Sequence, residues 1–106
     1  MTETLWERVD RARMFFDAKD YITAARMLSE LVPEVPEDGA LRLLLARAYY
    51  HSAQLGRAEN ELRLLLARDP ASDYTHLLLG RTLQRQSRHA EAHPHLRMAA
   101  AMTGEG

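Results

Sequence analysis

Three histidines near the end of this 106-residue chain are the residues whose types and spacing most nearly fit a chemical site. His89 and His93 are four residues apart, which places two imidazoles on one side of a helix at a spacing compatible with a metal ion. His95 is close by, but Pro94 disturbs the helical turn, and Glu91 lies elsewhere around the helix. We therefore interpret the three histidines as solvated side chains and expect no metal ion and no cofactor.

Catalysis has as little support as metal binding. The chain has no cysteine, which excludes thiolate nucleophiles, disulfides and zinc–cysteine sites. The serines fall at predicted helix ends or on surfaces, outside any nucleophile-elbow motif, and they are Ser29, Ser52, Ser72 and Ser87. The five glycines are scattered, so they form no glycine-rich phosphate loop. We expect that the protein is not an enzyme.

Composition narrows the remaining classes of function. A net charge of −1 gives no broad attraction to nucleic acid or to a membrane surface. The polar start MTETLWERVD is unlike a signal peptide, and no apolar run approaches the roughly 18–20 residues of a membrane span. With 46% hydrophobic residues, the chain can bury a core and is long enough for one small domain, residues 1–106. The lack of cysteine fits a reducing compartment, so a cytoplasmic location is expected.

The apolar spacing predicts six helices and no strand. Helix-start signals precede four of them: Thr4 with Glu7 as a capping box, then Asp20, Asp38, and Ser72 or Asp73. Breakers are expected to separate the helices: Pro33, Pro36 and Gly39 after the second, Gly56 in the turn after the third, Asp69-Pro70 after the fourth and Gly104 after the sixth. Because the connections are short, successive helices are expected to pack antiparallel.

A period of 34 residues runs through these helices. Small residues recur at Ala12, Ala46 and Gly80, bulky ones at Phe15, Tyr49 and Leu83, alanines at Ala24, Ala58 and Ala92, and leucines at Leu28, Leu62 and Leu96. Helix breakers recur at Pro36, Pro70 and Gly104. A small residue at a helix crossing, a large one beside it and a breaker at the end favour stacked copies of one helix hairpin.

This pattern resembles the tetratricopeptide repeat. The middle copy fits best, with Leu45, Ala46, Tyr49, Ala58, Leu62 and Pro70 at the motif positions. The other copies depart at Arg11, Leu83 and Gly104. The resemblance implies an all-α fold of three stacked antiparallel helix pairs in a short right-handed superhelix, with repeats at residues 5–38, 39–72 and 73–106. It also implies a protein-binding scaffold, because such stacks present a surface to another protein.

The first helix of each pair lines the concave side in this family. That resemblance implies a groove lined by Trp6, Val9, Arg13, Phe16, Leu43, Arg47, Tyr50, His51, Tyr74, Leu77, Arg81 and Arg85. Arg13, Arg47 and Arg81 share one register and would form a ladder, which favours a protein or peptide partner with acidic and apolar residues. Alternatively, Asp10 and Asp17 pair with Arg13 inside the protein.

A second possibility is an assembly subunit. The sequence stops soon after Gly104, so we expect no covering helix and a partly exposed apolar end formed by Leu78, Met98, Ala99 and Met102. Such an end favours self-association or docking on a larger partner. Nucleic acid is not expected as a partner, because the helical-repeat class that binds RNA has a slightly longer repeat and a strongly basic surface.

Overall fold

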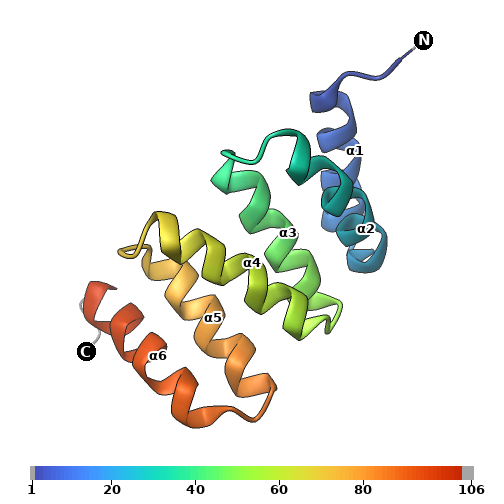
Figure 1. Ribbon diagram of the computed structural model, residues 1–106. Helices are drawn as coiled ribbons and strands as arrows, with labels where there is room; N and C mark the ends of the chain where they lie inside the picture. The colour runs from blue at the N-terminus through green and yellow to red at the C-terminus, as the bar shows by residue number, and fades with distance from the viewer. Residues whose placement is uncertain (1, 104–106) are drawn as a thin grey trace. The chain divides into compact units, whose positions relative to one another are not determined.

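The computed structural model describes residues 2–103, and that part of the chain is helical, without a strand (Figure 1). The helices are α1 (Leu5–Asp17), α2 (Tyr21–Leu31), the short 3-10 helix η1 (Val32–Glu34), α3 (Gly39–His51), α4 (Leu55–Arg68), α5 (Asp73–Arg85) and α6 (His89–Thr103). The prediction of an all-α fold of paired helices is confirmed. The chain divides into two compact units, Met1–Gln54 and Leu55–Gly106.

The helix starts follow the 34-residue period found in the sequence. The first helices of the pairs begin at Leu5, Gly39 and Asp73, and the second helices begin at Tyr21, Leu55 and His89. The chain therefore repeats a helix, a tight turn and a second helix with the same phase three times, which is the local structure that the periodic alanines and leucines predict.

The turn inside each pair repeats as well. Lys19, Ala53 and Ser87, again 34 residues apart, adopt positive φ angles of 65°, 61° and 61°. Their backbone N–H groups donate to the carbonyls of Phe16, Tyr50 and Gln84 over 2.9, 3.1 and 2.9 Å. This left-handed residue ends the first helix so that the second can fold back on it. The expectation for Gly56 was wrong: the turn uses Ala53, and Gly56 lies inside α4.

The predicted helix caps are present. Thr4 and Glu7 form both halves of a capping box, Asp20 accepts from the N–H of Thr23, and Asp38 accepts from the N–H of Leu41. Ser72, the first of the two alternatives for the fifth helix, accepts from the N–H of Thr75. Each cap satisfies a backbone donor that has no partner within the first turn.

Two expected helix breakers need comment. Gly39 does not help to end the second helix, because it is the first residue of α3. The chain leaves α2 at Leu31 through η1, where Pro33 is tolerated because the first turn needs no N–H donor there. Gly104, predicted to end α6, lies outside the described residues.

The first unit buries the apolar faces of α1, α2 and α3. Both α1 and α3 pack against α2, and the core between them includes Ala12, Ala24 and Leu28, each with no exposed surface. Leu31 and Ala48 belong to the same cluster. Alanines at these positions allow the helix axes to approach closely, as the sequence predicts.

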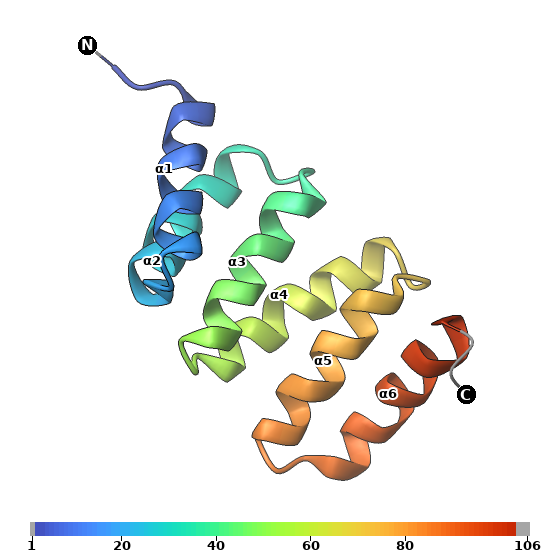
Figure 2. The ribbon, with the colours of Figure 1, turned by 180° about the vertical axis from the view of Figure 1, so that it is seen from behind.

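In the second unit, α5 packs against both α4 and α6, and the α5–α6 pair runs side by side in both ribbon views (Figure 2). Leu62, Leu79 and Leu83 are fully buried. Gly80 lies where α5 and α6 approach each other closely, because a Cβ atom there would lie 2.6 Å from Leu96 Cδ2. The predicted role of a small residue at this crossing is therefore confirmed.

Candidate interaction surface

Arg47 and Phe16 are the centre of the candidate site in the first unit. Phe16 is near the end of α1 and Arg47 is in the second half of α3. The guanidinium carbon of Arg47 lies 4.9 Å from the centroid of the Phe16 ring, a cation–π arrangement. The Arg47 Nε atom is buried without a hydrogen-bond partner among the described residues. The ring thus fixes where the arginine side chain lies.

Aromatic rings extend this centre toward α2. Tyr21 meets Phe16 edge to face at 5.2 Å and stacks on His51 at 4.6 Å with an interplanar angle of 25°. His51 also contacts Phe16 at 6.0 Å and Tyr50 at 5.5 Å. The sequence places Phe16, Tyr50 and His51 at the site but misses Tyr21, which lies on the second helix of the pair.

A cavity of about 250 Å³ adjoins this ring cluster. Its lining comes from the α1–α2 turn, the start of α2 and the end of α3, and consists of Lys19, Asp20, Tyr21, Ile22, His51 and Ser52. Ile22 is 71% exposed, so an apolar side chain stands in water at the rim. The cavity therefore offers an aromatic wall, an apolar edge and the lysine side chain to a bound group.

The remaining predicted groove residues differ in accessibility. Exposed ones include Trp6, Arg13, Tyr74, Arg81 and Arg85, whereas Leu43, Arg47, Tyr50 and Leu77 are half-buried. Val9 and Phe16 are core residues with 3% and 8% of their surface exposed. These two side chains thus support the surface from below and present little area of their own.

Only two of the three arginines of the predicted ladder lie in the same compact unit. Arg13 and Arg47 belong to the first unit and Arg81 to the second, so a continuous row stays a prediction. Within residues 2–103, neither Asp10 nor Asp17 forms an ion pair with Arg13. The internal pairing considered as the alternative is therefore not found there.

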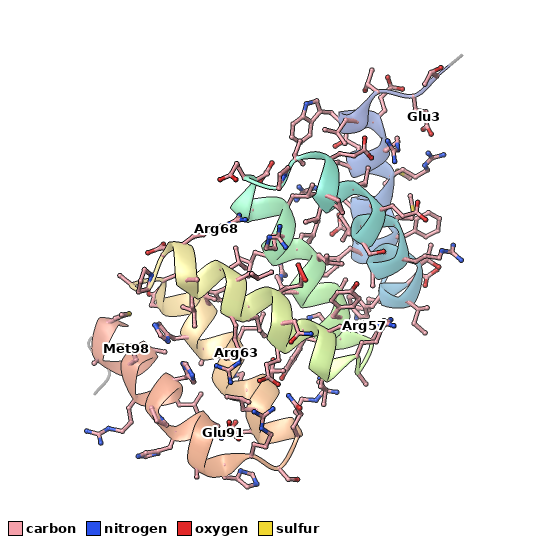
Figure 3. The ribbon with its side chains drawn as sticks, in the orientation of Figure 1. Glu3, Arg57, Arg63, Arg68, Glu91 and Met98 are labelled. Atoms are coloured by element: carbon pink, nitrogen blue, oxygen red, sulfur yellow. The ribbon has the colours of Figure 1, made fainter. Side chains whose placement is uncertain are left out.

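The apolar end predicted on the last repeat is smaller than expected. Met98 and Met102 on α6 are 45% and 39% exposed, and Met98 is visible on that helix in Figure 3. Leu78 and Ala99 are only 6% and 5% exposed, which corrects the expectation that they form part of an open surface. Leu78 is buried because α5 lies between α4 and α6.

An ion-pair cluster holds the α5–α6 turn to α4. Arg88 donates to Glu59 over 2.6 Å and to Glu91 over 2.7 and 2.8 Å, while Arg63 donates to Glu59 over 2.9 Å. Arg63 and Glu91 come from α4 and α6 (Figure 3). Burial opposes the charge on Glu59, but hydrogen bonds from Arg88, Arg63 and Gln86 together outweigh that effect and lower its pKa. We assign this cluster a structural role.

The three histidines of α6 differ in their exposure and in their contacts. His89 and His93 are exposed on α6, as expected. His95 is half-buried and contacts His76 of α5 across 3.0 Å, so the interpretation of His95 as solvated was wrong. Helical spacing within α6 gives no signal for this contact, because His76 comes from another helix. No group of three or more His, Cys, Asp or Glu residues suited to a metal ion occurs in the described part of the chain.

The repeated turn, the 34-residue phase of the helix starts and the small residue at the α5–α6 crossing define a helical-repeat protein. The family model for the tetratricopeptide repeat matches residues 15–82, more than half of the chain. The chain belongs to the tetratricopeptide repeat family, as its periodic residues predict, and it carries three repeats. Proteins of this family are generally interaction modules without catalytic activity.

Solved structures share the fold at low sequence identity. A mutant of MamA has a TM-score of 0.88 at 18% identity, covering 95% of this chain and 74% of that one. A MamA RS-1 ArsTM double mutant gives 0.85 at 22% identity, with coverages of 95% and 57%. A CopN–Scc3 complex gives 0.84 at 19% identity, with coverages of 92% and 58%. The chain thus spans 57–74% of the length of these three, and identities this low show the fold alone.

No curated protein matches the chain. Among residues 2–103, no helix is both long and apolar enough to cross a membrane.

Proposed function

We propose that this protein is a non-enzymatic interaction module that binds a peptide segment of another protein on the surface formed by α1, α3 and the start of α2. The observation that carries the proposal is the placement of the Arg47 guanidinium over Phe16, beside the Tyr21–His51 ring stack and its cavity. Family membership supports it, because tetratricopeptide repeats generally bind proteins. A similar fold in a CopN–Scc3 complex is consistent with that use.

The chemistry of this surface favours a partner with acidic and apolar residues. Arg47 carries a fixed positive charge, and its Nε is buried, so a bound carboxylate would meet the terminal nitrogens of the guanidinium. The neighbouring cavity has the size of a single large side chain and an apolar rim at Ile22. A peptide that places a carboxylate next to a leucine or an aromatic residue would satisfy both features.

Selection of binding peptides tests this proposal. Random 12-residue peptides are selected on the immobilised full chain, and a synthetic consensus peptide is then titrated by calorimetry. We expect an acidic residue next to an apolar one in the consensus, and at least tenfold weaker binding to Arg47→Gln. Arg26→Gln, which removes an exposed arginine on α2, is the matched control and should bind within twofold of the wild type. Equal affinity of Arg47→Gln and the wild type, or no selected binder, would refute the proposal.

A second candidate function is supported by the exposure of Met98 and Met102 on α6. In this alternative the protein self-associates or docks on a larger partner through that helix. Light scattering at high concentration tests self-association: Met102→Glu should lower the mass of any assembly, and a mass of one chain for the wild type would exclude self-association.

A further inference from the structure

The two rings of His76 and His95 meet edge to edge. Their Nδ1 atoms are 3.0 Å apart, and their centroids are 5.3 Å apart with an interplanar angle of 27°. The centroid separation exceeds the nitrogen–nitrogen distance by about the combined radii of the two rings, so each nitrogen points straight at the other. That arrangement fits an N–H···N hydrogen bond. It does not fit a shared metal ion, because two ligating lone pairs would have to converge on a third point.

A second hydrogen bond decides which ring carries the proton. The Nε2 atom of His76 lies 2.7 Å from the carbonyl oxygen of Pro70. A carbonyl can only accept, so Nε2 of His76 carries hydrogen and donates it. The neutral His76 ring then has a bare Nδ1, and the proton between the rings belongs to Nδ1 of His95. His76 is 8% exposed, so its ring is fixed inside the unit while His95 lies nearer the solvent.

The groups around His76 and His95 disfavour an additional positive charge on His95. Burial lowers the pKa of His95 below its ordinary value of 6.5, and His76 and the Arg63 guanidinium lower it further. The carboxylates that approach this region are already engaged: on α4, Glu59 pairs with Arg63 and Arg88, and on α6, Glu91 pairs with Arg88. Within residues 2–103, no carboxylate forms an ion pair with either imidazole.

Helix α6 depends on its contacts with α5 in the turn that contains Pro94 and His95. Pro94 lies inside α6 directly before His95 and cannot donate a backbone hydrogen bond to the preceding turn. An interior proline costs a helix roughly 3 kcal/mol, which tertiary contacts have to offset. His95 and Leu96 supply such contacts to His76 and Gly80.

We propose that His76 and His95 form a proton-sensitive clasp that fastens α6 to α5 and is released when both imidazoles become protonated. One proton lies between the two Nδ1 atoms, and His95 can take up another on its Nε2 without breaking the bond. Protonation of both rings leaves no acceptor and places two N–H groups and two positive charges against each other. The half-buried His95 then leaves its position against α5, and the turn of α6 that contains Pro94 loosens with it.

The pH dependence has a definite sign. The lowered pKa of folded His95 means that the unfolded chain binds this proton more readily. The neutral His95 ring therefore contributes its full stability above about pH 6.5, and this contribution is lost as the pH falls below that value, although the hydrogen bond itself breaks only when both rings are protonated. Both histidines belong to the second unit, so the clasp uses none of the first-unit residues proposed to bind a peptide and adds a regulatory property to the second unit.

Nitrogen-15 spectra of the wild-type imidazoles provide the first test, without any substitution. At pH 7.5 we expect His76 to be protonated on Nε2 and bare on Nδ1, and His95 to be protonated on Nδ1. A His76 ring with hydrogen on Nδ1 and none on Nε2 would overturn the proposal, because the clasp needs the opposite tautomer.

Urea unfolding between pH 7.5 and 5.0 provides the second test, on the wild type, His95→Gln and the control His93→Gln. As the pH falls, the wild-type unfolding constant should rise more steeply than that of His95→Gln, by up to about tenfold per pH unit, the limit for one additional proton bound on unfolding. His93→Gln, which changes an exposed residue on the same helix, should follow the wild type. Parallel curves for the wild type and His95→Gln would overturn the proposal.

Discussion

Replacing Gly80 by alanine should destabilise the protein although alanine is the better helix former. A Cβ atom at this position would lie 2.6 Å from Leu96 Cδ2, 2.7 Å from Leu96 Cγ and 3.4 Å from the Ala92 carbonyl oxygen. Because the Cγ atom is involved, a rotation of the Leu96 terminus alone cannot relieve the contact. Overpacking of this kind costs about 1–3 kcal/mol, and the gain in helix propensity returns about 1 kcal/mol. The free energy of unfolding should thus fall by roughly 1 kcal/mol.

Gly56→Ala is the matched control, because the same substitution meets no atom within 4 Å there. Gly56 lies inside α4, so alanine should raise the free energy of unfolding by up to about 1 kcal/mol. The two variants should therefore differ in opposite directions from the wild type. Thermal unfolding followed by circular dichroism resolves this, since about 1 kcal/mol shifts the Tm of a domain of this size by roughly 4–8 °C.

A double variant isolates the cause. In a Leu96→Ala background the obstructing side chain is absent, so Gly80→Ala should become neutral or stabilising. The packing argument would be refuted if Gly80→Ala stabilised the otherwise unchanged protein as much as Gly56→Ala does. It would equally fail if the cost of Gly80→Ala persisted unchanged without Leu96.

The other predictions concern charge, capping and the repeated turn. Glu59→Gln should lower the free energy of unfolding by about 2 kcal/mol at pH 7, because Arg88 and Arg63 lose a charged acceptor that is only 13% exposed. Its pKa is lowered from 4.5, so the difference from the wild type should shrink as the pH falls below that value, which urea titrations at pH 7 and pH 3.5 can measure. Thr4→Ala should cost about 1 kcal/mol by removing the cap of α1, measured in the same way. Ala53→Gly should stabilise by about 0.5 kcal/mol, since relief of the positive φ exceeds the added entropy of the unfolded chain; a lower Tm would contradict this.

The fold was predictable because the residues that determine helix packing recur with the 34-residue period. Small residues at Ala12, Ala46 and Gly80 recur at the spacing of the helix pairs, and a periodic pattern of that kind constrains helix type and phase together. The turns were less predictable. Their left-handed positions are occupied by Lys19, Ala53 and Ser87, none of which is the glycine that normally marks such a turn. Because glycine normally occupies such a position, the turn was predicted at the nearby Gly56 instead of at Ala53.

The candidate site was predicted from the spacing of residues within single helices, and the residues that this prediction missed lie on other helices. Helical spacing assigns residues to a face of α1 or α3 but gives no information on what α2 places beside them. Tyr21 was missed for this reason, although it stacks on the predicted His51. The His76–His95 contact joins residues 19 positions apart on two helices, and only the packing of α5 on α6 brings them together.

The burial of Phe16 does not remove it from the proposed site, because a core residue can act through the side chain that it supports. Its ring belongs to the hydrophobic core on one side and meets the Arg47 guanidinium on the other. An arginine held in this way has already lost part of its rotamer entropy on folding, so less is lost when a carboxylate binds. The same packing that stabilises α1 against α2 thus fixes the position of the charge that we assign to partner binding. A substitution of Phe16 would therefore affect both folding and the proposed binding, whereas a substitution of Arg13, which is exposed on α1, would leave the core unchanged.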